Sequence, residues 1–206
     1  TRLFLENYEV TPNMCGEIIS SAASHRRPEG HIEVLHLLLG YGADGKVLPP
    51  NFEAKRYSSY SFVHDGNTPS FARAFIHTLG PHSIDVSLFL LKSVAATHGN
   101  KFLEKMKPLV QSKVNAYTFS ESAADIIIHF IDEKKQEVQS LMELSRGAIR
   151  RSLLDLNCPF LRLNTLTMIP RVLHNYLRLS DLKKPDESVN VEEKETENEN
   201  FFYWEL

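Results

Sequence analysis

The sequence predicts an all-α protein, because three segments of the 206-residue chain carry the marks of α-helices. Residues 32–39 and 140–153 place apolar side chains at i, i+3 and i+4, a spacing that gathers them on one helical face. Residues 120–131 are apolar on most sides, which is typical of a buried helix. Glycines after the first segment and a serine at the start of each of the others are typical helix boundaries.

Composition and charge indicate an ordinary globular protein of one or two small domains. The two cysteines, Cys15 and Cys158, are too few for a disulfide framework or a zinc site. We find no signal peptide and no stretch long enough to span a bilayer. We therefore expect an intracellular protein, in the cytoplasm with the nucleus left open, and no membrane partner. Of the net charge of −3, residues 181–206 carry −6, and the remaining +3 predicts no nucleic-acid partner.

Residues 30–44 form an apolar helix followed by a glycine-containing turn. Gly40 and Gly42 mark the end of the helix. The segment is similar to the second helix and exit turn of an ankyrin repeat, which implies a stack of helical pairs. The apolar face consists of Ile32, Leu35, Leu38 and Leu39.

Residues 65–74 resemble the opening of a following repeat. Thr68 can cap a helix there, and Pro69 can occupy its first position. Residues 3–6 resemble the tail of an earlier repeat, and because the chain begins at Thr1 we expect the N-terminal part of the stack to be missing or divergent. The second helix of the following repeat would use a stripe of Ile84, Leu88 and Leu91.

The spacing of these repeats is irregular. Gly30 and Pro81 stand at equivalent positions 51 residues apart, against about 33 for an ankyrin unit. The excess lies mainly in residues 45–64, with a small insertion at 26–29. We therefore predict degenerate ankyrin repeats over residues 1–98. The long insertion is interpreted either as a partner-binding edge or as a loop without a role.

Residues 99–139 are predicted to form helices that cap the stack. One carries Phe102, Leu103 and Met106 and ends before Pro108. The second starts near Ser120, and its apolar residues on most sides predict burial on several sides. Residues 134–137 would form an exposed hinge.

Residues 140–153 begin with a capping box. Ser140 and Glu143, three residues apart, can each accept a hydrogen bond from a backbone N–H at a helix start. Arg146, Arg150 and Arg151 lie largely outside the stripe that follows. The stripe consists of Leu141, Leu144, Ser145, Ala148, Ile149, Ser152 and Leu153.

Residues 169–177 predict an extended step at Pro170 and then a short amphipathic helix. Together with residues 140–153 they resemble a suppressor-of-cytokine-signalling box, or SOCS box. In this chain Ser145 stands where the family pattern has cysteine, and Pro170 is the only proline of the usual Leu-Pro-x-Pro. The predicted fold is thus an irregular ankyrin-repeat stack, a three-helix SOCS box over residues 140–180 and a disordered acidic tail over 181–206.

The resemblance implies two partners and assigns residues to each. The elongin-binding residues would be Leu141, Leu144, Ser145, Ala148 and Ile149, with Leu141 filling a pocket on elongin C. The cullin side and the core of the box would consist of Ile169, Pro170, Leu173, Tyr176 and Leu177. The implied partners are elongin B/C, a cullin (with cullin five favoured) and an unidentified protein target.

Residues 201–206 close the sequence with an aromatic cluster that includes Trp204, the single tryptophan. One interpretation is that this segment folds back onto the box, and the other is that it docks onto another protein.

The sequence contains no recognisable catalytic, cofactor or metal site. His31 and His36 are five residues apart, as are His77 and His82, so neither pair has the i, i+4 spacing of a helical zinc site. The leading hypothesis is a non-enzymatic adaptor that recruits a target for ubiquitination. The alternatives are an ankyrin scaffold or binding module with no ligase link and, far behind, a hydrolase. Leu141 distinguishes the first two, since it should be exposed in an adaptor and buried in a cap.

Overall fold

The computed structural model describes residues 10–23, 32–45, 69–80, 83–115, 119–160, 163 and 169–182. Within these residues the regular structure is helical and contains no strand, which confirms the all-α prediction. The elements are α2 (Pro12–Ala23), α3 (Ile32–Gly40), α5 (Ser70–Thr78), α6 (Ile84–His98), the 3₁₀-helix η3 (Asn100–Met106), α7 (Lys107–Asn115), α8 (Glu121–Gln136), α9 (Leu141–Asp155) and α10 (Arg171–Leu177).

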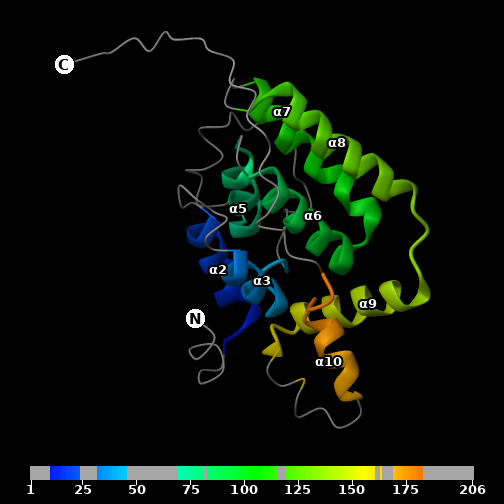
Figure 1. Cartoon of the computed structure of the whole chain (residues 1–206). Coiled ribbons are helices and arrows are strands. Elements are labelled where there is room, and N and C mark those ends of the chain that lie inside the picture. The colour runs from blue at the N-terminus through cyan, green and yellow to red at the C-terminus, as the bar shows by residue number, and fades with distance from the viewer. Residues whose placement is uncertain are drawn as a thin grey trace, which may run out of the picture.

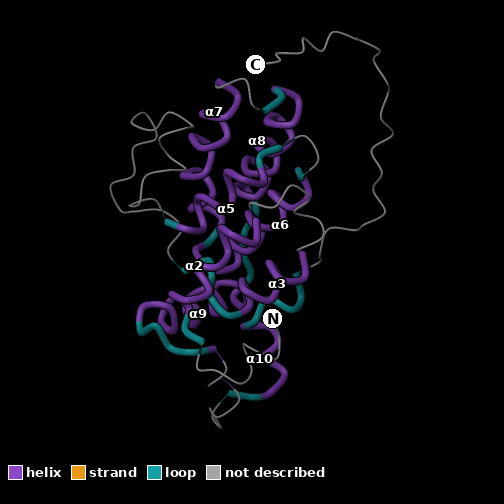
Figure 2. The backbone as a smooth tube through the Cα atoms, turned by 90° about the vertical axis from the view of Figure 1, so that its left-hand side faces the viewer, coloured by secondary structure: helices purple, strands orange, loops and turns teal. Residues whose placement is uncertain are grey.

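The helices pack in sequence along one body. α2 packs against α3, α5 packs against α6, and the two pairs meet where α2 contacts α5. η3 and α8 both pack against α6, and α7 packs against α8. At the other side, α9 packs against α6, and α10 packs against α9. Figures 1 and 2 both place α7 and α8 at one end of the molecule and α9 and α10 at the other.

One hydrophobic core runs through the described helices. Phe71 and Phe75 of α5 and Phe89 of α6 are fully buried in it. Of the predicted α6 stripe, Leu91 is buried, whereas Ile84 and Leu88 are only partly buried. The reason is that α6 is covered by neighbours around most of its circumference, so it has no single buried stripe.

The turn after α3 needs glycine at one position. α3 ends at Gly40 as predicted, and Gly42 follows with φ of +96°. A Cβ at Gly42 would lie 2.6 Å from the Leu154 Cδ2 atom of α9. Both the backbone conformation and the close approach of α9 therefore disfavour any residue with a side chain at this position.

Three predicted boundaries differ from the observed ones. α5 begins at Ser70, so Pro69 precedes the helix instead of opening it. Pro108 does not stop a helix, because it lies in the first turn of α7, where its missing N–H leaves no intrahelical hydrogen bond unmade. Lys134 belongs to the last turn of α8, so the predicted hinge begins later, after Gln136.

α8 starts where predicted but is less buried than predicted. The Ser120 hydroxyl caps it by accepting a hydrogen bond from the Ala123 N–H (3.2 Å). The expectation of burial on several sides is wrong for Ile126, which is 50% exposed. Ile127 and Ile131 are fully buried, so the helix has one inward face.

Several predictions lie outside the described residues: the repeat tail at 3–6, the insertion at 26–29, nearly all of the insertion at 45–64, the Thr68 cap, most of the chain between the two box helices, and the tail at 183–206. Among the described helices, none is both long and apolar enough to cross a membrane.

Candidate functional site

α9 begins with the predicted capping box. The Ser140 hydroxyl accepts a hydrogen bond from the Glu143 N–H (3.2 Å), and the Glu143 carboxylate accepts one from the Ser140 N–H (2.8 Å). These hydrogen bonds, first from the Ser140 backbone and then from its hydroxyl, hold the pKa of Glu143 below its ordinary value. The helix therefore starts afresh after α8.

Two arginines of α9 point inward, whereas the two leucines of its first turn point outward. Arg146 is 5% exposed and Arg150 is fully buried, whereas Leu141 is 81% exposed and Leu144 is 51% exposed. An amphipathic helix ordinarily does the reverse. The apolar side chains in the first half of α9 are therefore available to another molecule, and Arg146 and Arg150 are part of the protein interior.

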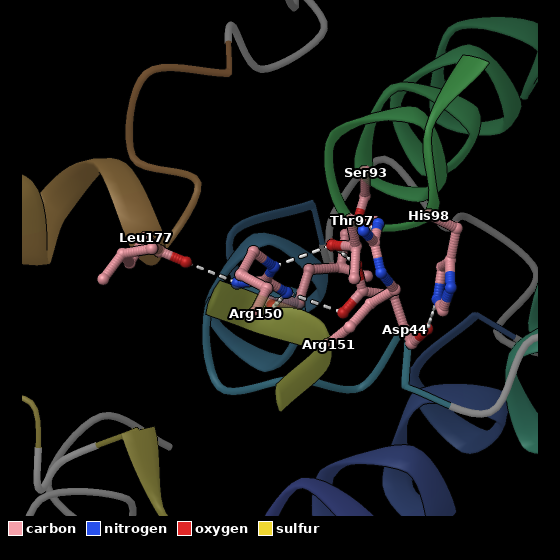
Figure 3. Close-up of polar contacts among 8 residues, drawn as sticks. Asp44, Ser93, Thr97, His98, Arg150, Arg151 and Leu177 are labelled. Carbon is pink, nitrogen blue, oxygen red and sulfur yellow. Dashed lines mark hydrogen bonds and ion pairs between the residues drawn. The ribbon is translucent and has the colours of Figure 1, made fainter. Parts of the chain in front are cut away.

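Arg150 holds α9 in place through four groups on three other helical segments (Figure 3). Its Nε donates to the Thr97 hydroxyl (2.7 Å), and its Nη2 donates to a carboxylate oxygen of Asp44 (2.7 Å) and to the Leu39 carbonyl (3.0 Å). Its Nη1 donates to the Leu177 carbonyl. Burial lowers the pKa of the guanidinium, and the Asp44 charge acts in the opposite direction. Each of the three nitrogens of this buried cation is thus hydrogen-bonded, as its burial requires.

Asp44 is the second half of this buried network. Its other carboxylate oxygen accepts hydrogen bonds from the Thr97 hydroxyl (2.6 Å) and the Ser93 hydroxyl (2.9 Å). His98 Nε2 lies 2.8 Å from the Asp44 carbonyl oxygen. The exit turn of α3, the last turns of α6 and the middle of α9 are thereby joined by one set of hydrogen bonds.

Two further contacts bring α9 onto the carboxyl end of α6. Arg151 donates to the Thr97 carbonyl (2.7 Å), where a cation is favoured by the helix dipole. A Cβ at Gly147 would lie 3.1 Å from the same carbonyl oxygen, so glycine permits this close approach.

The outward face of α9 and the adjoining face of α10 enclose a groove of about 440 Å³. On its inner side the Arg146 guanidinium stacks 4.1 Å from the centre of the Tyr176 ring and pairs with Asp181 (2.7 Å). Burial, the main cause, raises the pKa of Tyr176. We call this feature the α9–α10 groove; its lining residues are Leu141, Met142, Ser145, Arg146, Ile149, Leu173, Tyr176 and Leu177.

Models of known protein families, curated proteins and solved structures give no match to this chain.

The groove brings together six of the ten residues singled out from the sequence: Leu141, Ser145, Ile149, Leu173, Tyr176 and Leu177. Leu144 and Ala148 are exposed on α9 but do not line it. Pro170 is exposed and directly precedes α10 in the extended conformation predicted, while Ile169 is packed against the core. The Ile169 carbonyl oxygen lies 2.9 Å from His174 Nε2.

Sequence reasoning missed two lining residues, Met142 and Arg146, and the partners that anchor α9 beneath the groove. Met142 precedes Ser145 by three residues and Ile149 by seven, so the helical spacing could have identified it. Asp44 and Thr97 left no such signal, because each contacts Arg150 only through the tertiary fold.

The described lining of the groove is mainly apolar. Among its described lining residues, Arg146 and Tyr176 are the ionisable ones, and Arg146 is paired with Asp181. No cluster of three or more potential metal ligands occurs in the described part of the chain, which includes His36 and His77 but not their sequence partners.

A second hollow of about 630 Å³ lies between the start of α2, the exit turn of α3, the start of α5 and the end of α9. Its rim includes the charged residues Glu17, Arg73 and Asp155. Gly45 and Pro69, which also line it, border residues 46–68, outside the described part. The α9–α10 groove is therefore the better-defined candidate site.

Proposed function

We propose that this chain is a substrate-recognition adaptor of an elongin B/C–cullin ubiquitin ligase. The observation that supports this proposal most directly is the outward apolar face at the start of α9, a helix that buries Arg146 and Arg150 on its other side. The stripe follows the spacing that the sequence resemblance assigns to an elongin-binding helix, and α10 carries residues that the same resemblance assigns to the cullin side. The helices α2 to α6, proposed to be degenerate ankyrin repeats, would carry the target.

Energetics support a protein partner for the groove. Leu141, Met142 and Leu144 are all more than half exposed. Fully burying an exposed side chain of this size is worth about 1.5–3 kcal/mol, so covering a half-exposed one is worth roughly half as much. Most of the exposed large apolar side chains among the described residues lie on or beside α9 and α10. Such a concentration on one face is typical of an interaction surface.

The anchoring of α9 supports recognition without rearrangement. Arg150 and Arg146 fix the helix from beneath, so Leu141 and Ile149 are already presented. A pre-formed helical face binds without the cost of ordering it. In the proposed complex Leu141 fills a pocket on elongin C, and Met142, Ser145 and Ile149 pack beside it.

The cullin contact is assigned to α10 and the step before it. Val172 is 75% exposed there and Pro170 is also exposed. We propose cullin five as the partner at this end. The adaptor would act by proximity: a bound target gains a high local concentration of ubiquitin-charged enzyme, and no chemistry is required of this chain.

One observation favours the alternative of a binding module without a ligase link. The Asp44–Arg150 network joins the inner face of α9 to α6 and to the turn after α3, as expected of a capping helix. Such a module would use the same groove for a different protein.

The deciding experiment co-expresses the full chain with elongin B and elongin C and measures co-purification. We expect the parent to retain both elongins and Leu141→Asp to lose them, with a melting temperature near that of the parent because Leu141 is 81% exposed. Ile126→Asp is the matched control, since it places the same charge on an exposed apolar position of α8. Absence of elongin from the parent, or its retention by Leu141→Asp, would reject the proposal.

A further inference from the structure

The last described residues of the chain, Asp181 and Leu182, lie beside the α9–α10 groove. Asp181 accepts two hydrogen bonds from Arg146 (2.7 and 2.9 Å), and Arg146 lines the groove. Leu182, the next residue, is the last one described and packs partly against the core. Residues 183–206 therefore start one residue beyond a groove contact.

The sequence beyond this point ends in a segment whose chemistry matches the groove. Residues 183–200 are rich in charge and poor in apolar groups, whereas residues 201–206 read Phe-Phe-Tyr-Trp-Glu-Leu. The groove is lined mainly by leucine, isoleucine, methionine and tyrosine side chains. Its volume of about 440 Å³ falls within the range of about 300–1,000 Å³ typical of pockets that enclose a compact apolar ligand.

The tether is long enough to reach the groove and short enough to favour it. Nineteen residue steps separate Leu182 from Phe201, which sets a stretched limit of about 65 Å. Tethers of this kind produce effective concentrations on the order of 1 mM. If the intramolecular contact has a Kd of about 0.1 mM, the docked state would then outnumber the undocked state by about ten to one.

We propose that residues 201–206 fold back and occupy the α9–α10 groove whenever no other protein covers it. The aromatic side chains lie against Leu141, Met142 and Ile149, shielding the apolar stripe of α9 from water. The docking itself is independent of the proposed function. Its consequence, that elongin C must displace the segment, rests on that function.

Trp204 reports the docking directly, because it is the single tryptophan of the chain. In the full chain we expect its fluorescence emission to be blue-shifted, and its quenching by acrylamide to be weaker, relative to the urea-unfolded chain. Leu141→Asp and Ile149→Asp should each abolish both effects while the helical circular-dichroism signal is retained. Ile126→Asp, on α8, should leave both unchanged.

Three outcomes would overturn the inference. One is a parent Trp204 as accessible to acrylamide as in the unfolded chain. Another is protection of Trp204 that survives both groove variants, which would place the segment elsewhere. The third is protection that disappears on dilution, which would mean that the segment docks onto a second copy of the chain.

A separate measurement distinguishes failure of this inference from failure of the proposed function. Removing residues 201–206 should raise the affinity for elongin C about tenfold, the factor by which the docked state is favoured. Loss of Trp204 protection in the groove variants together with no elongin binding would retain the docking and reject the ligase role. Elongin binding with a fully accessible Trp204 would retain the ligase role and reject the docking.

Discussion

Replacing Arg150 by methionine tests the buried network that fixes α9. Methionine has a similar length but no charge and no donor. The substitution leaves the Asp44 carboxylate fully buried with only the Ser93 and Thr97 hydroxyls as side-chain donors. It also removes the donor to the Leu39 and Leu177 carbonyls.

The expected loss of unfolding free energy follows from the Asp44 charge, which remains buried without its cationic partner. Removing one partner of a buried ion pair costs about 3–5 kcal/mol, a large share of the total unfolding free energy of about 5–15 kcal/mol. For a chain of this size the melting temperature should fall by about 6–20 °C. Urea unfolding, followed by the helical circular-dichroism signal, measures the free energy, and a thermal scan measures the temperature.

A double variant separates the charge from the packing. Arg150→Met together with Asp44→Leu removes both charges, so the pair of substitutions should cost less than Arg150→Met alone. A loss below about 1 kcal/mol for Arg150→Met, the value of an exposed pair, would refute the buried-network reasoning. A double variant as destabilised as the sum of the single variants would refute the coupling of Arg150 to Asp44.

Gly42→Ala should destabilise the fold by about 1 kcal/mol or more, because a Cβ there meets both a left-handed backbone conformation and the Leu154 side chain; urea unfolding checks this against Gly80→Ala, where a Cβ meets nothing. Glu143 has a lowered pKa in the fold. Its ionised carboxylate therefore stabilises the folded state at pH values above the ordinary carboxyl pKa, and this contribution is lost as the pH falls through the lowered pKa. The stability gap between the parent and Glu143→Gln should therefore shrink from about pH 7 to about pH 3, and a constant gap would contradict the cap. Burial raises the pKa of the Cys15 thiol to about 12, so a thiol reagent at neutral pH should leave Cys15 unmodified until urea unfolds the chain; mass spectrometry locates the label, and rapid native labelling of Cys15 would contradict its burial.

Local signals in the sequence were sufficient to place several elements. Ser140 with Glu143 predicted the start of α9, Ser120 predicted that of α8, and the glycines after residue 39 predicted the end of α3. Each depends on hydrogen bonds or backbone angles within a few residues, so the neighbouring sequence determines them.

Periodicity identified which residues of α9 share a face but could not determine which face points inward. Leu141 and Ile149 face outward because Arg150 finds its partners at positions 44, 97 and 177. Those partners are distant in sequence and meet only in the folded chain. The same limit explains Ile126, since an apolar residue on a helix is buried only where a neighbouring element covers it.

The single guanidinium of Arg150 contacts the ends of α3, α6 and α10 at once. This fixes the orientation of α9 relative to all three helices. A protein seated on Leu141 and Ile149 would share one rigid frame with the helices that precede α9. The distance between a protein bound at α9 and one bound at the preceding helices would be set by the fold instead of by a flexible linker. Under the proposed function, only target lysines that the frame brings within reach would receive ubiquitin, so geometry would select among targets alongside affinity.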